Sequence, residues 1–117
     1  MTELRLAETP APPYYAVIFT SLHKDGDGEE YANAAASMCQ LAAEQEGYLG
    51  IESVRDSDGV GITVSYWKDE ASIRNWYEVA EHRAVQERGR ASWYEAYDVR
   101  VCRVERAYSF PGQEADA

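Results

Sequence analysis

Hydrophobic and polar positions along the chain predict alternating strands and helices. Tyr14–Leu22 is aromatic, β-branched and almost continuously apolar, which predicts a central strand buried on both faces. Two shorter strands are predicted at Tyr48–Arg55 and Val60–Lys68, joined by a hairpin turn at Asp56–Gly59. The last strand is predicted over Trp93–Phe110.

Two segments between these strands have helical spacing. Glu29–Glu46 repeats small and apolar residues at every third or fourth position, and Gly47 is the expected left-handed stop. Asp69 is the expected cap of a second helix from Glu70 to about Ala80, followed by a further turn or short helix over His82–Arg88 that ends at Gly89. The predicted apolar stripes are Tyr31, Ala34, Ala35, Met38, Leu41, Ala42 and Gln45 in the first helix, and Ile73, Trp76, Tyr77 and Ala80 in the second.

The last predicted strand is long, and its apolar side changes partway. Val99 and Val101 share one parity, whereas the apolar residues from Val104 onward share the other. This change predicts a bulge at Cys102–Arg103, or a handover of the strand from one packing partner to another. Such length also indicates that part of the strand leaves the domain and pairs elsewhere.

The element order β-α-β-β-α-β predicts an α+β fold of the ferredoxin-like type, an antiparallel sheet with both helices on one face. We expect one domain over residues 14–110, an extended proline-rich arm over 1–13 that drapes over a neighbour, and a flexible tail over 111–117. The predicted strands carry bulky side chains on both faces, so the face without helices needs a cover. A second copy is the simplest cover, which predicts a homodimer with its sheets face to face and its last strands crossing over.

Composition narrows the classes of function. The 117 residues include 45% of hydrophobic type, which is sufficient for the core of one domain. The 21 acidic and 11 basic residues give a net charge of −10, which argues against nucleic-acid and anionic-membrane partners. The sequence contains neither an apolar run of the ~20 residues that a membrane span needs nor a start typical of a signal peptide, so we expect a cytoplasmic protein. Cys39 and Cys102 fit neither a disulfide framework nor a metal site.

Arginine, tyrosine and tryptophan are the chemically informative residue types of this sequence. The segment from His82 to Arg106 is arginine-rich in an otherwise acidic chain, which indicates a charge match within or between subunits, or a small anionic ligand. The sequence contains nine tyrosines and three tryptophans but two phenylalanines, so rings with a polar group outnumber purely apolar rings. Such rings line pockets for flat ligands, and they are equally typical of dimer interfaces.

Several short segments together resemble the antibiotic biosynthesis monooxygenase family, and above all its uncharacterised bacterial branch. They are Gly47–Ser53, Gly61–Trp67, Trp76, His82-Arg83, Gln86, Gly89-Arg90, Trp93-Tyr94, Tyr97 and Arg100-Val101. The resemblance covers about residues 14–110 and implies a dimeric α+β barrel. It also implies one of two activities, cofactor-independent oxygenation of aromatic polyketides or oxidative degradation of haem.

The two branches of the family differ in their key residues. The haem-degrading branch uses an asparagine on the first strand, a tryptophan on the second helix and a histidine ten residues later. Trp76 matches the tryptophan, but the first strand has no asparagine and Gln86 stands at the histidine position. The polyketide oxygenases use a tryptophan on the third strand and an asparagine four residues earlier, which correspond here to Trp67 and Thr63. We therefore expect no haem, no metal and no other cofactor.

The candidate catalytic residues are His82, Arg83 and Trp67. A histidine can exchange a proton near neutral pH, and the arginine beside it can stabilise a phenolate. The candidate substrate-binding residues are Trp76, Tyr66, Arg90, Trp93, Tyr94 and Tyr97. Each also has a structural interpretation, because a histidine can cap a helix, rings can fill a core or an interface, and Arg90 can pair with a carboxylate of a partner.

Three functions are consistent with this sequence. The first is a cofactor-independent monooxygenase acting on a small aromatic or quinone-type compound in a pocket between the helices and the sheet. The second is a dimeric small-molecule binding or sensing module that uses the same pocket without catalysis. The third, which the residue matches support less, is a haem-binding or haem-degrading protein.

Overall fold

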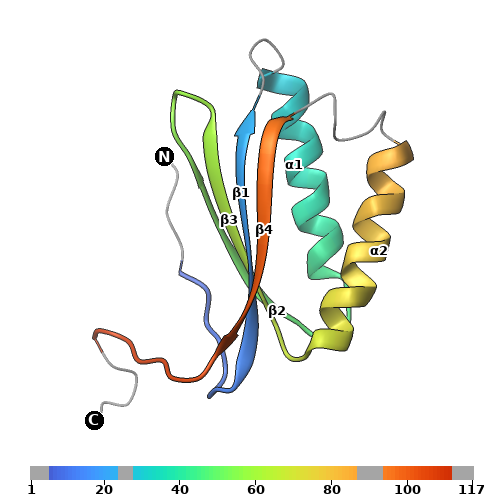
Figure 1. Ribbon diagram of the computed structural model, residues 1–117. Helices are drawn as coiled ribbons and strands as arrows, with labels where there is room; N and C mark the ends of the chain where they lie inside the picture. The colour runs from blue at the N-terminus through green and yellow to red at the C-terminus, as the bar shows by residue number, and fades with distance from the viewer. Residues whose placement is uncertain (1–5, 24–27, 87–93, 112–117) are drawn as a thin grey trace.

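The computed structural model describes residues 6–23, 28–86 and 94–111 (Figure 1). Its elements are β1 (Tyr14–His23), α1 (Gly28–Ala43), β2 (Tyr48–Arg55), β3 (Val60–Trp67), α2 (Glu70–Gln86) and β4 (Tyr94–Val104). The strands form one antiparallel sheet in the order β2-β3-β1-β4, and Figure 1 shows both helices on the same face of it. The predicted α+β, ferredoxin-like fold is confirmed.

β1 lies inside the sheet, between β3 and β4, as its nearly continuous apolar sequence predicts. Tyr15 is paired with Trp67 of β3, so the odd-numbered residues of β1 share a face with Trp67 and the even-numbered residues share the other. Trp67 stacks on Trp76 of α2, which identifies the odd face as the one under the helices. We call this the helix side and the opposite surface the open face.

The core on the helix side is organised around the indole of Trp67, which has 0% of its surface exposed. Its ring lies 6.0 Å from that of Trp76 in a stacked arrangement and 5.7 Å from that of Tyr48, edge to face. Its Nε1–H donates a 2.9 Å hydrogen bond to Ser65 Oγ, so the one polar atom of the ring is satisfied. One side chain thus joins α2 and β2 to β3.

α2 begins at an acidic cap and runs without interruption to its end. The carboxylate of Asp69 accepts hydrogen bonds from the Ser72 hydroxyl (2.7 Å) and the Ser72 backbone N–H (2.9 Å), and these bonds lower the pKa of Asp69. The predicted boundary near Ala80 was wrong, because the helix continues to Gln86. Tyr77, predicted in the buried stripe, is 60% exposed.

β4 is shorter and more regular than its sequence predicted. Its pairing with β1 is continuous from Ala96 to Val104, so the expected bulge at Cys102–Arg103 was wrong. Along the described pairing of these two strands the register shifts only between Leu22 and His23. Residues 105–111 are not part of the sheet, and the pairing of this segment with another chain stays a prediction.

The described part of the N-terminal arm, residues 6–13, is fastened to the protein's own sheet. The backbone N–H of Ala7 donates to Glu52 Oε2 (2.9 Å), and the hydroxyl of Thr9 donates to the Tyr14 hydroxyl (2.9 Å). Glu52 and Tyr14 are on the open face, so the arm covers one end of that face. A contact of the arm with a neighbouring chain stays a prediction.

No helix in the described ranges is long and apolar enough to cross a membrane.

Gly47 and Gly59 offer a matched test of the helix-to-strand junction. Both have positive φ, 89° at Gly47 and 94° at Gly59. A Cβ added to Gly47 would overlap the side chain of Ser72. A Cβ added to Gly59 would have the His23 carbonyl oxygen, at 3.1 Å, as its nearest neighbour. Gly59→Ala should therefore lower the free energy of unfolding by about 1–2 kcal/mol, and Gly47→Ala by about 1–3 kcal/mol more. Urea denaturation measures the free energy of unfolding of both variants. Equal losses would contradict the close approach of Gly47 to Ser72.

Candidate functional site

The residues predicted to form a site lie on both faces of the sheet. Tyr66 lies on the open face, on the other side of the sheet from Trp67 and Trp76. Tyr94 and Tyr97 lie on the helix side, because both contact the ring of Phe19, an odd-numbered residue of β1. The structure therefore does not bring Tyr66 together with the other candidates. Arg90 and Trp93 lie outside the described residues.

Tyr66 is held as a neutral hydrogen-bond donor. Its hydroxyl donates to Glu52 Oε1 at 2.8 Å, and its ring contacts that of Tyr14 edge to face at 6.0 Å. Burial, the hydrogen bond to Glu52 and the negative charge of that carboxylate raise the pKa of Tyr66 to about 12. This pair satisfies one carboxylate oxygen on the open face and the arm satisfies the other.

Trp67 and Trp76 occupy different positions relative to solvent. Trp67 is fully enclosed, so its ring supports the site through packing on its neighbours. Trp76, stacked on it from α2, is half-buried and is the ring of this pair that solvent reaches. The structure thus brings the candidate catalytic residue Trp67 into contact with the candidate substrate-binding residue Trp76.

Three rings form a second aromatic cluster on the helix side, at the start of β4. Phe19 lies 5.2 Å from Tyr97 and 5.5 Å from Tyr94, and the two tyrosines lie 5.7 Å apart. Sequence analysis predicted both tyrosines but missed Phe19. The signal was present, because Phe19 is an odd-numbered residue of the central strand and its neighbour on β4, Val99, lies on the same face.

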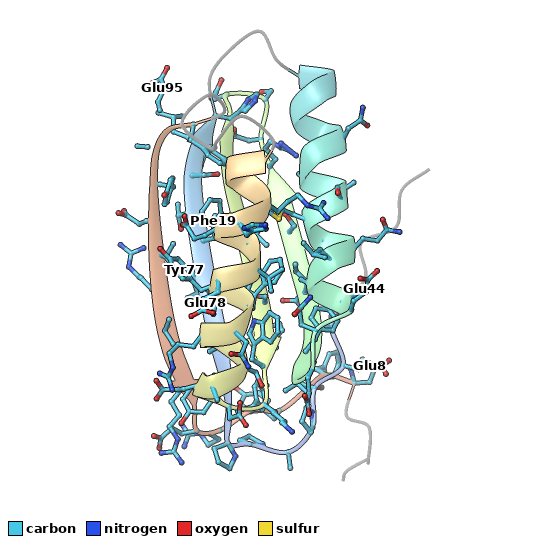
Figure 2. The ribbon with its side chains drawn as sticks, turned by 90° about the vertical axis from the view of Figure 1, so that its right-hand side faces the viewer. Glu8, Phe19, Glu44, Tyr77, Glu78 and Glu95 are labelled. Carbon is cyan, nitrogen blue, oxygen red and sulfur yellow. The ribbon has the colours of Figure 1, made fainter. Side chains whose placement is uncertain are left out.

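The helices leave the β4 side of this face partly uncovered. α2 packs on β3, and Figure 2 places Tyr77 on the side of α2 nearer to β4. Val99 and Val101 of β4 are 50% and 52% exposed, Tyr97 is 39% exposed and Tyr77 is 60% exposed. The apolar strip, as we call it, consists of Phe19, Tyr77, Tyr94, Tyr97, Val99 and Val101. Half-exposed rings and valines in one row are typical of a surface that binds a flat apolar partner.

His82 and Arg83 leave α2 in different directions, because consecutive residues of a helix are about 100° apart. Arg83 is half-buried, and its Nη1 donates to Ser37 Oγ of α1 at 3.1 Å. His82 is exposed to solvent. Arg83 is thus positioned between the helices, while His82 is accessible to a ligand or to water.

A pair of hydroxyl groups lies on the helix side, one from Ser53 of β2 and one from Thr63 of β3, which is four residues before Trp67. Ser53 Oγ and Thr63 Oγ1 are 2.7 Å apart, and either can donate to the other. Thr63 is the residue found where the resembling oxygenases have an asparagine. Its hydroxyl can donate or accept one hydrogen bond with Ser53, whereas the asparagine amide of the oxygenases offers a separate donor and acceptor.

The described residues include scattered potential metal ligands and two free cysteines, Cys39 and Cys102. They contain no cluster of three or more histidine, cysteine, aspartate or glutamate side chains that could hold a metal ion. Burial raises the pKa of the Cys39 thiol, which favours its protonated form.

Comparisons with known proteins agree with the resemblance read from the sequence. A family model described as antibiotic biosynthesis monooxygenase matches residues 13–88. The chain is 51% identical to an uncharacterised Bacillus subtilis protein, YqjZ, over 90% of this chain and 91% of that protein. It is 32% identical to a jasmonate monooxygenase of Pyricularia oryzae, over 77% of this chain but 43% of the fungal protein. Among solved structures, the fold is similar to SnoaB, a cofactor-independent oxygenase from Streptomyces nogalater, with a TM-score of 0.67, 12% identity and coverage of 80% of this chain and 95% of that one.

Tyr66→Phe tests the network on the open face. Loss of a hydrogen bond to a carboxylate should lower the free energy of unfolding by about 1.5–3 kcal/mol at neutral pH. Because folding raises the pKa of Tyr66 to about 12, its contribution is complete below the unfolded pKa near 10 and is lost as pH rises toward 12. The gap between wild type and variant should therefore shrink over that range in urea titrations. Tyr77→Phe is the exposed control, and a gap that stays constant to pH 12 would contradict the assignment.

Proposed function

This chain belongs to the antibiotic biosynthesis monooxygenase family, and we propose that within it the protein is a cofactor-independent monooxygenase acting on a small aromatic or quinone-type compound. The observation that carries this proposal is the apolar strip. It places aromatic rings in mutual contact on the helix side, where α2 leaves β4 half-exposed. The jasmonate monooxygenase among the relatives supports the reaction class.

The strip suits a flat ring and not a strongly charged ligand. Phe19 and Tyr97 offer ring faces, Val99 and Val101 offer apolar contact, and a substrate lying on them would remove their exposed surface from water. The net charge of −10 disfavours a polyanion anywhere on this protein. A neutral, fused-ring compound with a weakly acidic hydroxyl or methylene group matches both conditions.

The reaction that such a site can perform uses the substrate as its own reductant. An electron-rich hydroxylated ring that loses a proton can itself supply the electrons that reduce O2, so the protein needs no redox group of its own. For an anthrone-type ring, the methylene carbon loses two hydrogen atoms and gains one oxygen atom as a carbonyl, and the second oxygen atom leaves as water. The protein then has to bind the ring, accept the proton and stabilise the anion.

We assign these roles to the residues that the fold supplies. His82, exposed near the end of α2, would accept the proton. Arg83, held by Ser37, would place positive charge at the same helix end to stabilise the anion. Trp76, Tyr94 and Tyr97 would contact the ring, while Trp67 positions Trp76 from below. Arg90 and Trp93, outside the described residues, stay predicted ligand contacts.

We also propose that the working unit is a homodimer. The open face carries apolar side chains that the helices of the same chain cannot reach, because both helices lie on the other face (Figure 1). A second copy placed sheet to sheet would bury them and form a dimeric α+β barrel. This assembly leaves the apolar strip, on the helix side, accessible to a small molecule.

Oxygen uptake with 1,8-dihydroxyanthrone, measured in the presence of a metal chelator, tests the activity. The wild type should accelerate uptake and yield the anthraquinone with one water per O2. His82→Asn should lower kcat about 100-fold because proton transfer is lost. Tyr97→Ser should mainly raise KM, and Arg74→Gln, exposed on the same helix, should behave as wild type. Saturable quenching of tryptophan fluorescence with no uptake from any ring compound would instead identify a binding module.

A further inference from the structure

Three oxidisable rings form an unbroken chain from α2 through the core to the start of β2. Trp76 of α2 stacks on Trp67 of β3, with 6.0 Å between the ring centroids and 20° between the ring planes. Trp67 in turn contacts Tyr48 of β2 edge to face, with centroids 5.7 Å apart. Trp76 and Tyr48 are half-buried and Trp67 is 0% exposed, so the chain meets solvent at its two ends and is dry at its centre.

The centre of this chain is an indole at a position where the core needs only apolar contact. A purely apolar side chain at position 67 would need no hydrogen-bond partner. The indole does need one, and Ser65, itself 7% exposed, accepts its Nε1–H at 2.9 Å. Burial of apolar surface therefore does not by itself require a tryptophan here. What distinguishes an indole from an apolar side chain is that it gives up an electron far more easily.

The second aromatic cluster of the helix side differs in this respect. Tyr94 and Tyr97 contact each other, but the third ring is Phe19, and a phenylalanine ring resists one-electron oxidation. An electron vacancy formed on either tyrosine would therefore not continue through Phe19 toward the centre of the sheet. Of the two clusters, the one around Trp67 consists of oxidisable rings throughout.

We propose that Trp76, Trp67 and Tyr48 form a relay that carries one oxidising equivalent from the side of α2 to Tyr48. The oxidant is an organic peroxyl radical, which forms when a substrate radical leaves the productive reaction and adds O2. The inference rests on the proposed function for this source, because a substrate that reduces O2 with its own electrons passes through a radical. The relay would remove the oxidant before it damages the ring that contacts the substrate.

The transfer balances in electrons and protons. The peroxyl radical takes one electron from Trp76 and one proton from water, and it leaves as the hydroperoxide. Trp67 then reduces Trp76, and Tyr48 reduces Trp67 and releases its phenolic proton to water. One peroxyl radical is consumed and one phenoxyl radical is formed. A soluble reductant such as ascorbate finally returns a hydrogen atom to Tyr48.

The surroundings of Trp67 favour onward transfer. An oxidised indole is a strong acid, and once it has lost its proton it is a weaker oxidant. Ser65 is a poor base, and Trp67 has no exposed surface through which water could take the proton. Oxidised Trp67 therefore keeps its proton and remains able to oxidise Tyr48, whose half-buried phenol can release its own proton to solvent.

Pulse radiolysis with the azide radical, which oxidises indoles in preference to phenols, tests the relay without a substrate. A Trp93→Phe background leaves Trp67 and Trp76 as the indoles of the chain. The indolyl absorption should decay as the phenoxyl absorption grows, at a rate independent of protein concentration. Tyr48→Phe should remove this phase, whereas Tyr108→Phe, at a ring that is 92% exposed, should keep it. A phase that survives in Tyr48→Phe, or one that is absent from the Trp93→Phe background, would overturn the relay.

Peroxyl radicals released in water by an azo compound, with ascorbate present, test the protective role. Mass mapping of peptides should find Trp76 oxidised faster in Tyr48→Phe than in the wild type, and at the wild-type rate in Tyr108→Phe. Equal oxidation of Trp76 in all three proteins would overturn that role. Neither assay measures oxygen uptake with a ring compound, so a failed relay leaves the proposed monooxygenase standing. Intact radical transfer without any oxygen uptake would overturn the proposed function alone.

Discussion

Two helices can cover only one face of a four-stranded sheet, and most features of this protein follow from that constraint. On the covered face, the indole of Trp67 gathers Trp76 and Tyr48 around it and so fixes α2 over β3. Because α2 is fixed there, β4 is left half-exposed beside it, and the apolar strip results. On the other face, the arm covers one end, and Leu22, Val54, Val60 and Ile62 are left 36–54% exposed at the other.

The two faces of the sheet present different side chains, and the network around Tyr66 shows why. Tyr66 and Trp67 are neighbours in the sequence but point to opposite sides of β3, so one serves the open face and the other the helix side. The first is a polar anchor for Glu52 and the arm, and the second is a buried apolar anchor for α2. The proposed substrate on the apolar strip and the proposed second copy on the open face would therefore occupy different surfaces.

Sequence patterns predicted the elements well, since each has a local physical cause. β1 is apolar on both faces, Gly47 adopts the left-handed conformation, and Asp69 caps α2, all as the residues themselves indicate. The errors arise where the outcome depends on packing. Tyr77 has the spacing of a buried residue, yet it is 60% exposed on a helix whose main sheet contact is with β3. The change of parity after Val101 reflects the end of the sheet at Val104, where the chain leaves it, and not a bulge.

The central claim is that this fold needs a second copy to cover its open face. Sedimentation equilibrium of the wild-type protein at micromolar concentration measures this most directly, because it reports mass without reference to shape. We expect twice the 13.2 kDa of one chain, with little dependence on salt since the contact is mainly apolar. A well-folded species that sediments as a single chain of 13.2 kDa across the concentration range would contradict the account.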